Sequence, residues 1–596
     1  MTFPLIRTKW TNEHVMTALL GVIMLYNLPV WIQSPAGLFR FAVLVVIALI
    51  LDAGLNFIRY RKPTCAVSAA ITAAIVYTLA PQVPLEGLIL GIAAALAFGK
   101  HAFGGTGRNF LNPAILGYLI IAVVFETGFP VFQPSWLLLP GILLGIPFMV
   151  FRPFASCGLI LGMLLQLALR QELTLEGLAS YGILFFACIV MTDPVTVTDK
   201  PAIGGAGGFI AGFVMLLSPS PVTFCLSILG FNLLSRLADM LIYQPVSGIR
   251  FRLKLPKPVA VKISDAAVMD LTEDKANSEL EFNILDDMEP TELLRTLEKA
   301  GVYGQGGAGF PTWRKLDSLL KSESKEKHLI VNGVECDPGL IHDKWLLLNN
   351  SEMIGKGIAL LKQAAGFKTV TLAVKSAEDL SFAQDIRICQ VPDFYPAGAE
   401  RTLIKEVLGL QLHSGDIPSQ KGILVLNVQT VLSIYDAVYR GKKADTRYLT
   451  ISNLFTGDIR IARVRLGERI RDIAEKVFPA AVNVFSGGGM MQARLVKKED
   501  VMDTGTNYIA TGRFPNYKES PLCSRCGNCV RYCPEGLDVR RIAKLVDDGD
   551  AAGAKKYHPE RCLSCGSCSY VCLAGRNLSD RVMGARDAIR GKPVKS

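Results

Sequence analysis

Long apolar runs, separated by short polar breaks, fill the first part of the chain and stop near residue 248. From about Arg250 onward, charged and apolar residues are mixed as they are in soluble proteins. A helix needs about 20 apolar residues to cross a bilayer, so the pattern predicts an all-α polytopic membrane domain of about ten helices over residues 1–250. Several runs are shorter than this, which makes half-helices an alternative for some spans. The runs lie near residues 13–31, 39–58, 65–81, 84–99, 112–126, 136–151, 155–169, 178–192, 206–219 and 221–243.

The charges of the connecting loops predict the orientation of this domain, because lysine and arginine collect on the cytoplasmic side of membrane proteins. The loops on the side opposite the N-terminus contain only Arg40 and Arg170. We therefore expect a multi-pass protein of a prokaryotic cytoplasmic membrane, without a cleavable signal peptide and with its C-terminal part in the cytoplasm. The basic residues on the N-terminal side are Arg7, Lys9, Arg59, Arg61, Lys62, Lys100, Arg108, Arg152 and Lys200.

Composition narrows the possible partners and the compartment. The net charge of +11 could suggest nucleic acid. No basic helix, aromatic platform or nucleic-acid motif accompanies it, so we expect the lipid membrane as a partner and no nucleic acid. Of the 14 cysteines, most fall in two compact runs with metal-ligand spacing, which favours a reducing compartment over a disulfide framework.

Few ionisable residues interrupt the apolar runs. Asp52, Arg236 and Asp239 are the examples. One interpretation places them near the cytoplasmic ends, where they reach water or pair with each other, and this is the simpler one. The alternative is a role in an ion pathway.

Two cytoplasmic connections are rich in residues that can bind a polar planar group. One runs from Gly104 to Pro113 and the other from Met191 to Thr198. Glycines allow close backbone approach, while Asn, Asp and Thr supply directional hydrogen bonds. Composition alone leaves a second interpretation open, in which both segments are tight turns that cap helices.

Together, these two motifs, their order and the layout of spans resemble RnfD, the membrane component of the Rnf ferredoxin:NAD complex, and the related B-type membrane component of the sodium-pumping NADH:quinone reductase. The resemblance covers roughly residues 10–250 and implies a flavin at the cytoplasmic face. The chain lacks the outer Ser-Gly-Ala-Thr-type segment whose threonine is esterified to FMN in that family, so a second flavin here would be non-covalent. The candidate residues for this site are Arg108, Asn109, Asn112, Asp193 and Thr196.

A glycine-rich string follows a polar linker that we expect at residues 251–292. Clustered glycines before a helix-compatible stretch expose backbone amides to a phosphate, and a lysine adds positive charge. The candidate residues of the string are Gly304, Gly306, Gly307, Gly309 and Lys315.

The whole string resembles the FMN-binding loop shared by RnfC, the flavin and iron-sulfur component of the Rnf complex, and the NADH-oxidising flavoprotein of respiratory complex I. Segments 329–339, 397–403 and 426–430 follow in the order of that family. The resemblance implies an α/β FMN- and NADH-binding domain over residues 293–445, with FMN as cofactor and NAD(H) as substrate. Departures such as Asp337, where a glutamate is common, affect the nucleotide more than the phosphate cradle. The further candidates are Asn332, Glu335, Asp337, Glu400, Asn427 and Thr430.

Residues 446–490 alternate like short strands and end in a helical pattern. They resemble the small β-grasp (SLBB-like) domain that follows the flavin fold in that family. The N-terminal sandwich domain of the family has no counterpart, because the membrane domain takes its place in the chain.

Two four-cysteine runs lie within residues 510–580 and predict an α-helical ferredoxin-like domain. In such runs three thiolates hold one 4Fe-4S cluster, and the fourth ordinarily crosses to the other cluster. A zinc ribbon would use paired Cys-x-x-Cys knuckles instead. The expected ligands are Cys523, Cys526, Cys529 and Cys572 for one cluster, and Cys562, Cys565, Cys568 and Cys533 for the other.

The chain thus resembles a fusion of an RnfD-like membrane domain with an RnfC-like flavin and iron-sulfur domain. The resemblance implies an oxidoreductase that passes electrons between NAD(H), FMN and two 4Fe-4S clusters. Its partners would be other membrane and redox subunits of an Rnf-like, ion-translocating complex and ferredoxin or cytochrome carriers. Two alternatives remain: an NAD-independent conduit between such carriers and a membrane carrier, and a membrane half that is a cofactor-free anchor or transporter.

Overall fold

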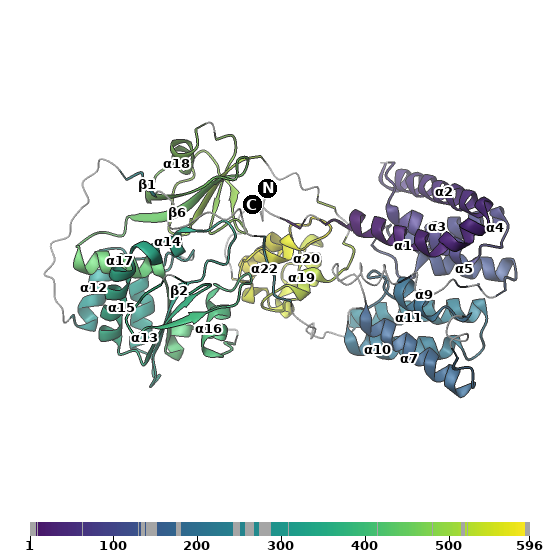
Figure 1. Ribbon diagram of the computed structural model, residues 1–596, viewed down its shortest axis with the longest axis horizontal. Coiled ribbons are helices and arrows are strands. Elements are labelled where there is room, and N and C mark those ends of the chain that lie inside the picture. Colours follow the sequence, from purple (N-terminus) through teal and green to yellow (C-terminus); the bar gives the residue numbers. More distant parts are fainter. Residues whose placement is uncertain are drawn as a thin grey trace.

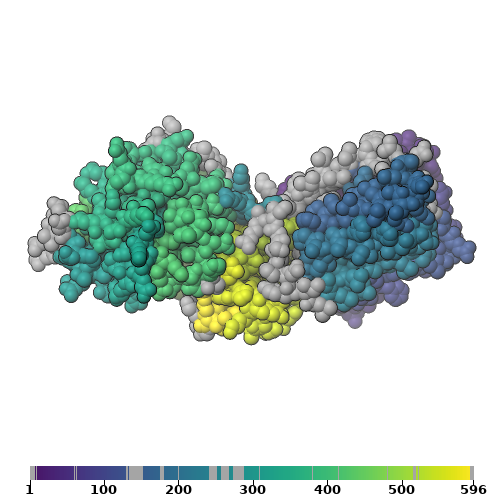
Figure 2. Space-filling model, turned by 90° about the horizontal axis from the view of Figure 1, so that it is seen from below, coloured from purple at the N-terminus to yellow at the C-terminus, as the bar shows by residue number. Residues whose placement is uncertain are grey.

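The computed structural model describes residues 7–590, apart from residues 9, 62, 106, 129, 131, 133–137, 139–151, 175–179, 199, 242–250, 257–267, 273–287, 308, 379, 414, 480, 514–518 and 521–522. Figure 1 shows a helical body from the first part of the chain, an α/β body, and a small C-terminal helical body between them. The view in Figure 2, turned by 90°, also places the C-terminal body between the other two.

The first body is built from apolar helices. Three of its described helices are long and apolar enough to cross a membrane, namely α1, α2 and α11. The expected run at residues 136–151 lies outside the described residues except for Leu138. The helices are α1 (Asn12–Gln33), α2 (Pro35–Tyr60), α3 (Val67–Leu79), α4 (Leu85–Ala94), α5 (Pro113–Val124), α7 (Pro153–Leu169), α9 (Ile183–Phe185), α10 (Pro201–Met215) and α11 (Pro221–Leu241).

Two of these helices continue as π-helical segments. Helix α4 runs on into η1 (Ala95–His101), and α9 runs on into η3 (Phe186–Val190). Wide turns of this kind are rare and often occur at functional sites. Each segment leads into one of the two polar connections identified in the sequence.

Glycines bring α7 and α10 into backbone contact. A Cβ atom on Gly158 would lie 2.2 Å from the carbonyl oxygen of Gly205, and one on Gly212 would lie 2.2 Å from that of Leu159. Small residues at four-residue spacing are what allow membrane helices to approach closely. Glycines that the sequence pattern shows only as part of apolar runs therefore form this helix interface.

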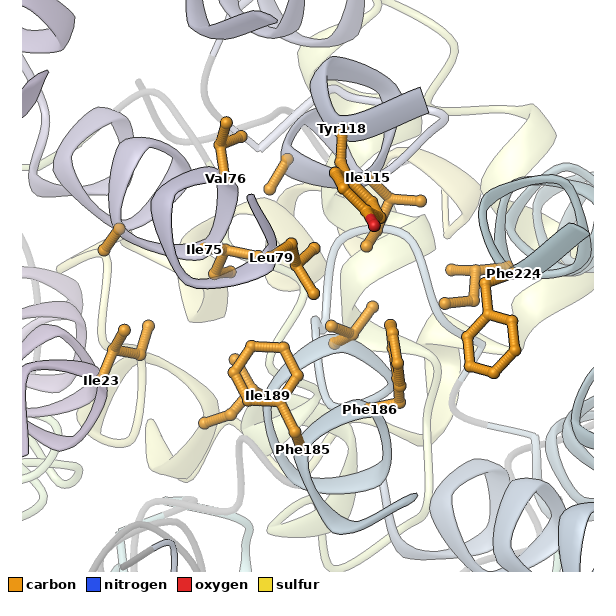
Figure 3. Packing of buried hydrophobic residues seen from close by; sticks show 14 of the residues in the cluster. Ile23, Ile75, Val76, Leu79, Ile115, Tyr118, Phe185, Phe186, Ile189 and Phe224 are labelled. Carbon is orange, nitrogen blue, oxygen red and sulfur yellow. The ribbon is translucent and has the colours of Figure 1, made fainter. Parts of the chain in front are cut away.

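Aromatic side chains fill the centre of the first body. Figure 3 shows Phe186 between Leu79 of α3 and Phe224 of α11, with Phe185 beside it. The ring centroids of Phe186 and Phe224 are 5.3 Å apart. The short α9–η3 segment therefore joins the α1–α5 group to α7, α10 and α11.

The α/β body contains a four-stranded parallel sheet with the order β4-β3-β2-β5. The strands are β2 (His328–Gly333), β3 (Thr369–Val374), β4 (Arg387–Gln390) and β5 (Ile423–Asn427). The helices around it are α12 (Pro290–Lys299), α13 (Thr312–Leu320), α14 (His342–Asn349), α15 (Ser351–Ala365), α16 (Glu400–Leu408) and α17 (Val428–Tyr439).

A second, mixed sheet has the order β1-β7-β6-β10-β8-β9. Its strand β1 lies within residues 251–292 and pairs with β7, so this segment is more than the linker we expected. A strand of three residues is too short to show a recognisable alternation of apolar and polar side chains. The sheet also extends beyond residue 490. The elements are β1 (Val268–Asp270), β6 (Thr446–Asn453), β7 (Ile459–Arg465), α18 (Ile470–Val477), β8 (Val484–Gly487), β9 (Arg494–Leu495) and β10 (Tyr508–Thr511).

The C-terminal body consists of two similar halves. Each half has a cysteine run, a short helix and a longer helix, and the two longer helices pack together. Arg525 and Ser564 occupy equivalent places and both have positive φ, 55° and 56°. The helices are α19 (Asn528–Arg531), α20 (Val539–Asp547), η6 (Gly553–Tyr557), η7 (Pro559–Arg561), α21 (Ser567–Tyr570) and α22 (Leu578–Ile589).

Candidate functional site

Asn332 and Asn427 stand at the carboxyl ends of the neighbouring strands β2 and β5, where they pair in register. In the chain, the strands run outward from β2 to β3 and β4, and then the order reverses to β5 on the other side. Ligands of open parallel sheets bind at such a switch point, outside the carboxyl ends of the strands. The topology therefore brings together two asparagines that lie far apart in the sequence.

The glycine-rich loop covers this switch point. A Cβ atom on Gly306 would lie 3.5 Å from the Cβ of Asn427. Gly307 has φ +106°, a conformation that side chains rarely adopt, and Gly309 has φ +60° with Thr504 against its α-carbon. The amides of Gly306 and Gly307 lie at an exposed tip and donate to no described residue, so they are available to an anion.

Four further expected residues lie in or around the same loop. The Thr430 hydroxyl accepts a 2.9 Å hydrogen bond from the amide of Gln305. Lys315, in the first turn of α13, forms a 3.0 Å ion pair with Glu400. Gly304 closes the base of the loop by donating to the carbonyl of Phe310. The loop is therefore fixed at its base and has a cation beside it.

Buried ionisable groups lie beneath the loop. Glu335 accepts a 2.6 Å hydrogen bond from the amide of Asp343, whose carboxylate accepts one of 2.7 Å from Asn427. Ligand atoms of Glu335, His342 and Asp343 lie within 4.8 Å of one another. Burial raises the pKa of both carboxyl groups above their usual range and lowers the pKa of His342 to about 3, which keeps that imidazole neutral.

Asp337, expected near the nucleotide, is buried and its carboxylate is occupied. It accepts hydrogen bonds from the amides of Gly339 at 3.0 Å, Met490 at 2.8 Å and Met491 at 2.9 Å. Met490 and Met491 belong to the second sheet domain. Asp337 therefore joins the two α/β domains.

Arg447 of β6 is the main residue that the sequence did not indicate. It is 2% exposed and donates a 3.0 Å hydrogen bond to the carbonyl of Gln305 and one of 3.2 Å to that of Asp503. Burial lowers its pKa to about 10, so it stays charged at neutral pH. It supports the glycine loop from below, but an arginine in an alternating strand carries no motif that would have revealed this.

The cysteines form two groups, each drawing on both runs. Thiols close enough to interact electrostatically with Cys529 are Cys523, Cys526 and Cys572. Those that interact in the same way with Cys568 are Cys562, Cys565 and Cys533. The fourth cysteine of each run thus lies beside the first three cysteines of the other run.

The spacing within these groups is too wide for one zinc ion. Sulfur atoms around a tetrahedral zinc lie about 3.8 Å apart, given Zn–S bonds of about 2.3 Å. Among the described residues, no three cysteine sulfurs lie within 4.8 Å of one another. The arrangement fits the larger 4Fe-4S core.

The group that contains Cys565 docks against the α/β body. The Tyr395 hydroxyl donates a 2.7 Å hydrogen bond to the carbonyl of Cys565, and Gln492 donates one of 3.1 Å to the carbonyl of Ser564. A Cβ atom on Gly566 would lie 2.6 Å from the carbonyl of Met491, the residue whose amide Asp337 binds. Cluster loop, second sheet and flavin fold are therefore in continuous contact.

The group that contains Cys526 docks against the membrane half. Arg152 donates a 2.7 Å hydrogen bond to the carbonyl of Arg525, the residue equivalent to Ser564. The guanidinium of Arg525 lies 3.2 Å from the carboxylate of Asp239. A Cβ atom on Gly107 would lie 2.7 Å from the carbonyl of Cys523. The two equivalent loops thus contact two different bodies.

A cavity of about 180 Å³ lies where the membrane half meets this second group. Cys526, Ser524 and Leu573 contribute to its wall, together with residues of α1, α3, η1, α5 and η3. Pockets for complete drug-sized ligands measure about 300–1,000 Å³, so this one suits a ring system rather than a whole dinucleotide.

Three of the five residues expected to bind a membrane flavin line this cavity, namely Asn109, Asn112 and Asp193. Asn109 is buried, and its Oδ1 has no hydrogen-bond partner among the described residues, so it can accept from a ligand. Thr196 donates to Asp193 at 2.8 Å without lining the cavity. The exposed Arg108 folds against Gly104 and does not line it either.

Three family models match successive parts of the chain. Residues 2–138 match the NQR2, RnfD, RnfE family, residues 297–436 match the Nuo51 FMN-binding domain, and residues 522–575 match a 4Fe-4S dicluster domain. The glycine loop, both asparagines and all eight clustered cysteines fall within the last two matches, and the cavity residues of η1 and α5 fall within the first.

Named relatives agree with these matches. The chain is 30% identical to the C component of an ion-translocating oxidoreductase complex of Haemophilus influenzae (strain PittEE), over 53% of this chain and 51% of the relative. It is 30% identical to the C component of a proton-translocating ferredoxin:NAD(+) oxidoreductase complex of Clostridium ljungdahlii, over 43% of this chain and 58% of the relative.

Among solved structures, an NAD+-reducing [NiFe]-hydrogenase in the H2-reduced state has a TM-score of 0.35 and 17% identity, over 51% of this chain and 67% of that one. At this score the likeness supports no conclusion about the chain. The chain spans about half the length of the curated relatives that it matches. It is therefore similar to the C components of ion-translocating oxidoreductase complexes, and it combines this similarity with a region that matches the RnfD family model.

Proposed function

We propose that this chain is an oxidoreductase subunit that conducts electrons between a flavin fold in the cytoplasm and a redox site in the membrane. The observation that carries the proposal is the position of the C-terminal body: its Cys565 loop contacts the flavin fold, and its Cys526 loop contacts the membrane cavity. Clusters of this type carry single electrons.

The glycine loop and the asparagines at the switch point support FMN at the soluble end. The amides of Gly306 and Gly307 and the charge of Lys315 suit its phosphate, and Asn332 and Asn427 stand where the ring would lie. Flavin, when bound, exchanges electron pairs with NAD(H) and single electrons with clusters. Arg447 fixes the loop, and the acids at Glu335 and Asp343 would face the nucleotide.

The sets Cys523, Cys526, Cys529, Cys572 and Cys533, Cys562, Cys565, Cys568 would hold two 4Fe-4S clusters. Burial raises the pKa of the Cys533 thiol to about 12, so cluster iron is needed to supply the charge that stabilises the thiolate. The second sheet with α18 would be the β-grasp domain, and it holds the Cys565 loop through Gln492.

A second, non-covalent flavin would occupy the membrane cavity. The free Oδ1 of Asn109 is a hydrogen-bond acceptor for the N–H of such a ring. Flavin extraction from the purified full chain tests this directly. We expect a second flavin in addition to the one in the glycine-loop domain. If the membrane half were a cofactor-free anchor or transporter, that second flavin would be missing.

The surroundings of the protein follow from the same proposal. The chain would work with other membrane and redox subunits of an Rnf-like, ion-translocating complex and with ferredoxin or cytochrome carriers. Its about ten spans would place both the N-terminus and the redox domains in the cytoplasm of a prokaryote, as the loop charges predict. Reporter fusions check this: fusions after residues 62 and 152 should give a cytoplasmic signal and a fusion after Pro84 an external one, and the reverse pattern would contradict it.

A further inference from the structure

Three ionisable side chains are buried together at the edge of the membrane cavity. Lys100 Nζ lies 2.9 Å from Asp52 Oδ1, and His101 Nε2 lies 2.8 Å from the same oxygen. The exposed fractions of these side chains are 3% for Lys100, 0% for Asp52 and 7% for His101. Buried charges in a membrane domain are costly, so such a group indicates a function.

The local structure fixes this group. The π-helical η1 ends with Lys100 and His101, and both side chains reach Asp52 on α2. The other Asp52 oxygen, Oδ2, accepts from the amide of Ala66 at 3.0 Å and from Asn56 at 3.4 Å. Asp52 is therefore held in place and presents one oxygen to two proton carriers.

Lys100 connects the group to the cavity. Lys100 and Ser68 both line the cavity, and Lys100 donates a 2.9 Å hydrogen bond to the Ser68 hydroxyl. Cys526, an expected cluster ligand, lines the same cavity. A buried lysine and an expected cluster ligand thus lie on the wall of one small cavity.

We propose that Lys100 is the proton donor to the ring bound in the membrane cavity, and that Asp52 and His101 return the proton to it. The inference rests on the proposed second flavin. A flavin ring, if bound there, would take up electrons supplied by a reduced cluster together with a proton. The N–H bond of the Lys100 ammonium would break and leave a neutral amine, and a proton held by His101 would pass through Asp52 to restore the ammonium.

His101 suits the role of the returning group. Its Nδ1 is buried and has no hydrogen-bond partner among the described residues, while its Nε2 lies 2.8 Å from Asp52 Oδ1. Arg59, on an exposed part of α2, donates to the carbonyl of His101. Among the described residues, Cys65 also interacts electrostatically with Lys100, and Asp193 lines the same cavity.

Lys100→Arg tests the proposal in the full chain, because arginine keeps the positive charge but does not release a proton. We expect the membrane flavin to be retained. Its protonation after reduction should be about 10²-fold slower at pH 8, with a stronger pH dependence, so that the absorption of the unprotonated reduced ring becomes visible. Lys200→Arg is the matched control, since Lys200 is also buried and lies 3.9 Å from Asp239 but does not line the cavity.

Lys100→Ala provides a second measurement. Ethylamine can fill the space left by the lysine, so adding it should restore fast protonation in Lys100→Ala but not in Lys100→Arg. An unchanged rate of flavin protonation in Lys100→Arg would overturn the role of Lys100 alone. The same conclusion would follow if ethylamine failed to restore protonation in a Lys100→Ala chain that retains its flavin. If the wild-type chain held no second flavin, the proposed membrane cofactor would fail first, and this inference with it.

Discussion

Replacing Cys565 with serine should leave the soluble flavin reducible by NADH and stop electrons before they reach the membrane cavity. A serine hydroxyl is a poor substitute for a soft thiolate ligand, so one cluster and roughly half of the iron should be lost. Its loop is the one that touches the flavin fold through Tyr395. The other cluster and the membrane flavin should then stay oxidised.

Cys526→Ser distinguishes an ordered electron route from a general loss of electron transfer. It should remove the other cluster, and the cluster next to the flavin fold should still become reduced. Cys389→Ser, in strand β4 and outside both runs, is the matched control and should keep all the iron. Reduction of the membrane flavin by NADH at the normal rate in Cys565→Ser would contradict the proposed route.

Gly307→Val should weaken FMN binding about 5–150-fold while both clusters remain. The backbone at Gly307 has φ +106°, and forcing a branched residue into it costs about 1–3 kcal/mol, which corresponds to that range of affinity. The measurement is FMN content together with an FMN titration of the apoprotein.

Gly306→Ala is the control for this loop. Gly306 is not in the positive-φ region, and a Cβ atom there makes only an ordinary 3.5 Å contact with Asn427. FMN binding should therefore change little. Equal losses in the two variants, or full FMN retention in Gly307→Val, would show that the loop does not cradle the phosphate.

The sequence is most informative where the spacing of a motif indicates its chemistry. The two cysteine runs are an example: they predict a 4Fe-4S domain, and residues 522–575 match a 4Fe-4S dicluster domain, while the ligand role of each cysteine stays a prediction. Asn332 and Asn427 are also expected site residues, and only the sheet order shows that residues so far apart in the chain lie side by side. Long-range pairing of this kind leaves no local signal.

Residues that act by burial were missed. Arg447 and His101 belong to no motif, and their importance comes from the partners that folding gives them. The sequence indicates that Asp52 either reaches water or pairs, and the structure shows it paired with Lys100. From the sequence alone, Lys100 is only one of the loop charges. Strand β1 and the π-helical segments were also not foreseen, because three residues or one wide turn make no periodic pattern.

The most direct test of the central claim is to mix the full chain with NADH under anaerobic conditions and to record which centres are reduced first. The two cluster signals are assigned beforehand from Cys565→Ser and Cys526→Ser. We expect the soluble flavin to be reduced first, then the cluster of Cys565, then the cluster of Cys526, and the membrane flavin last. Reduction of the Cys526 cluster or of the membrane flavin before the Cys565 cluster would contradict it, and so would a soluble flavin that NADH cannot reduce.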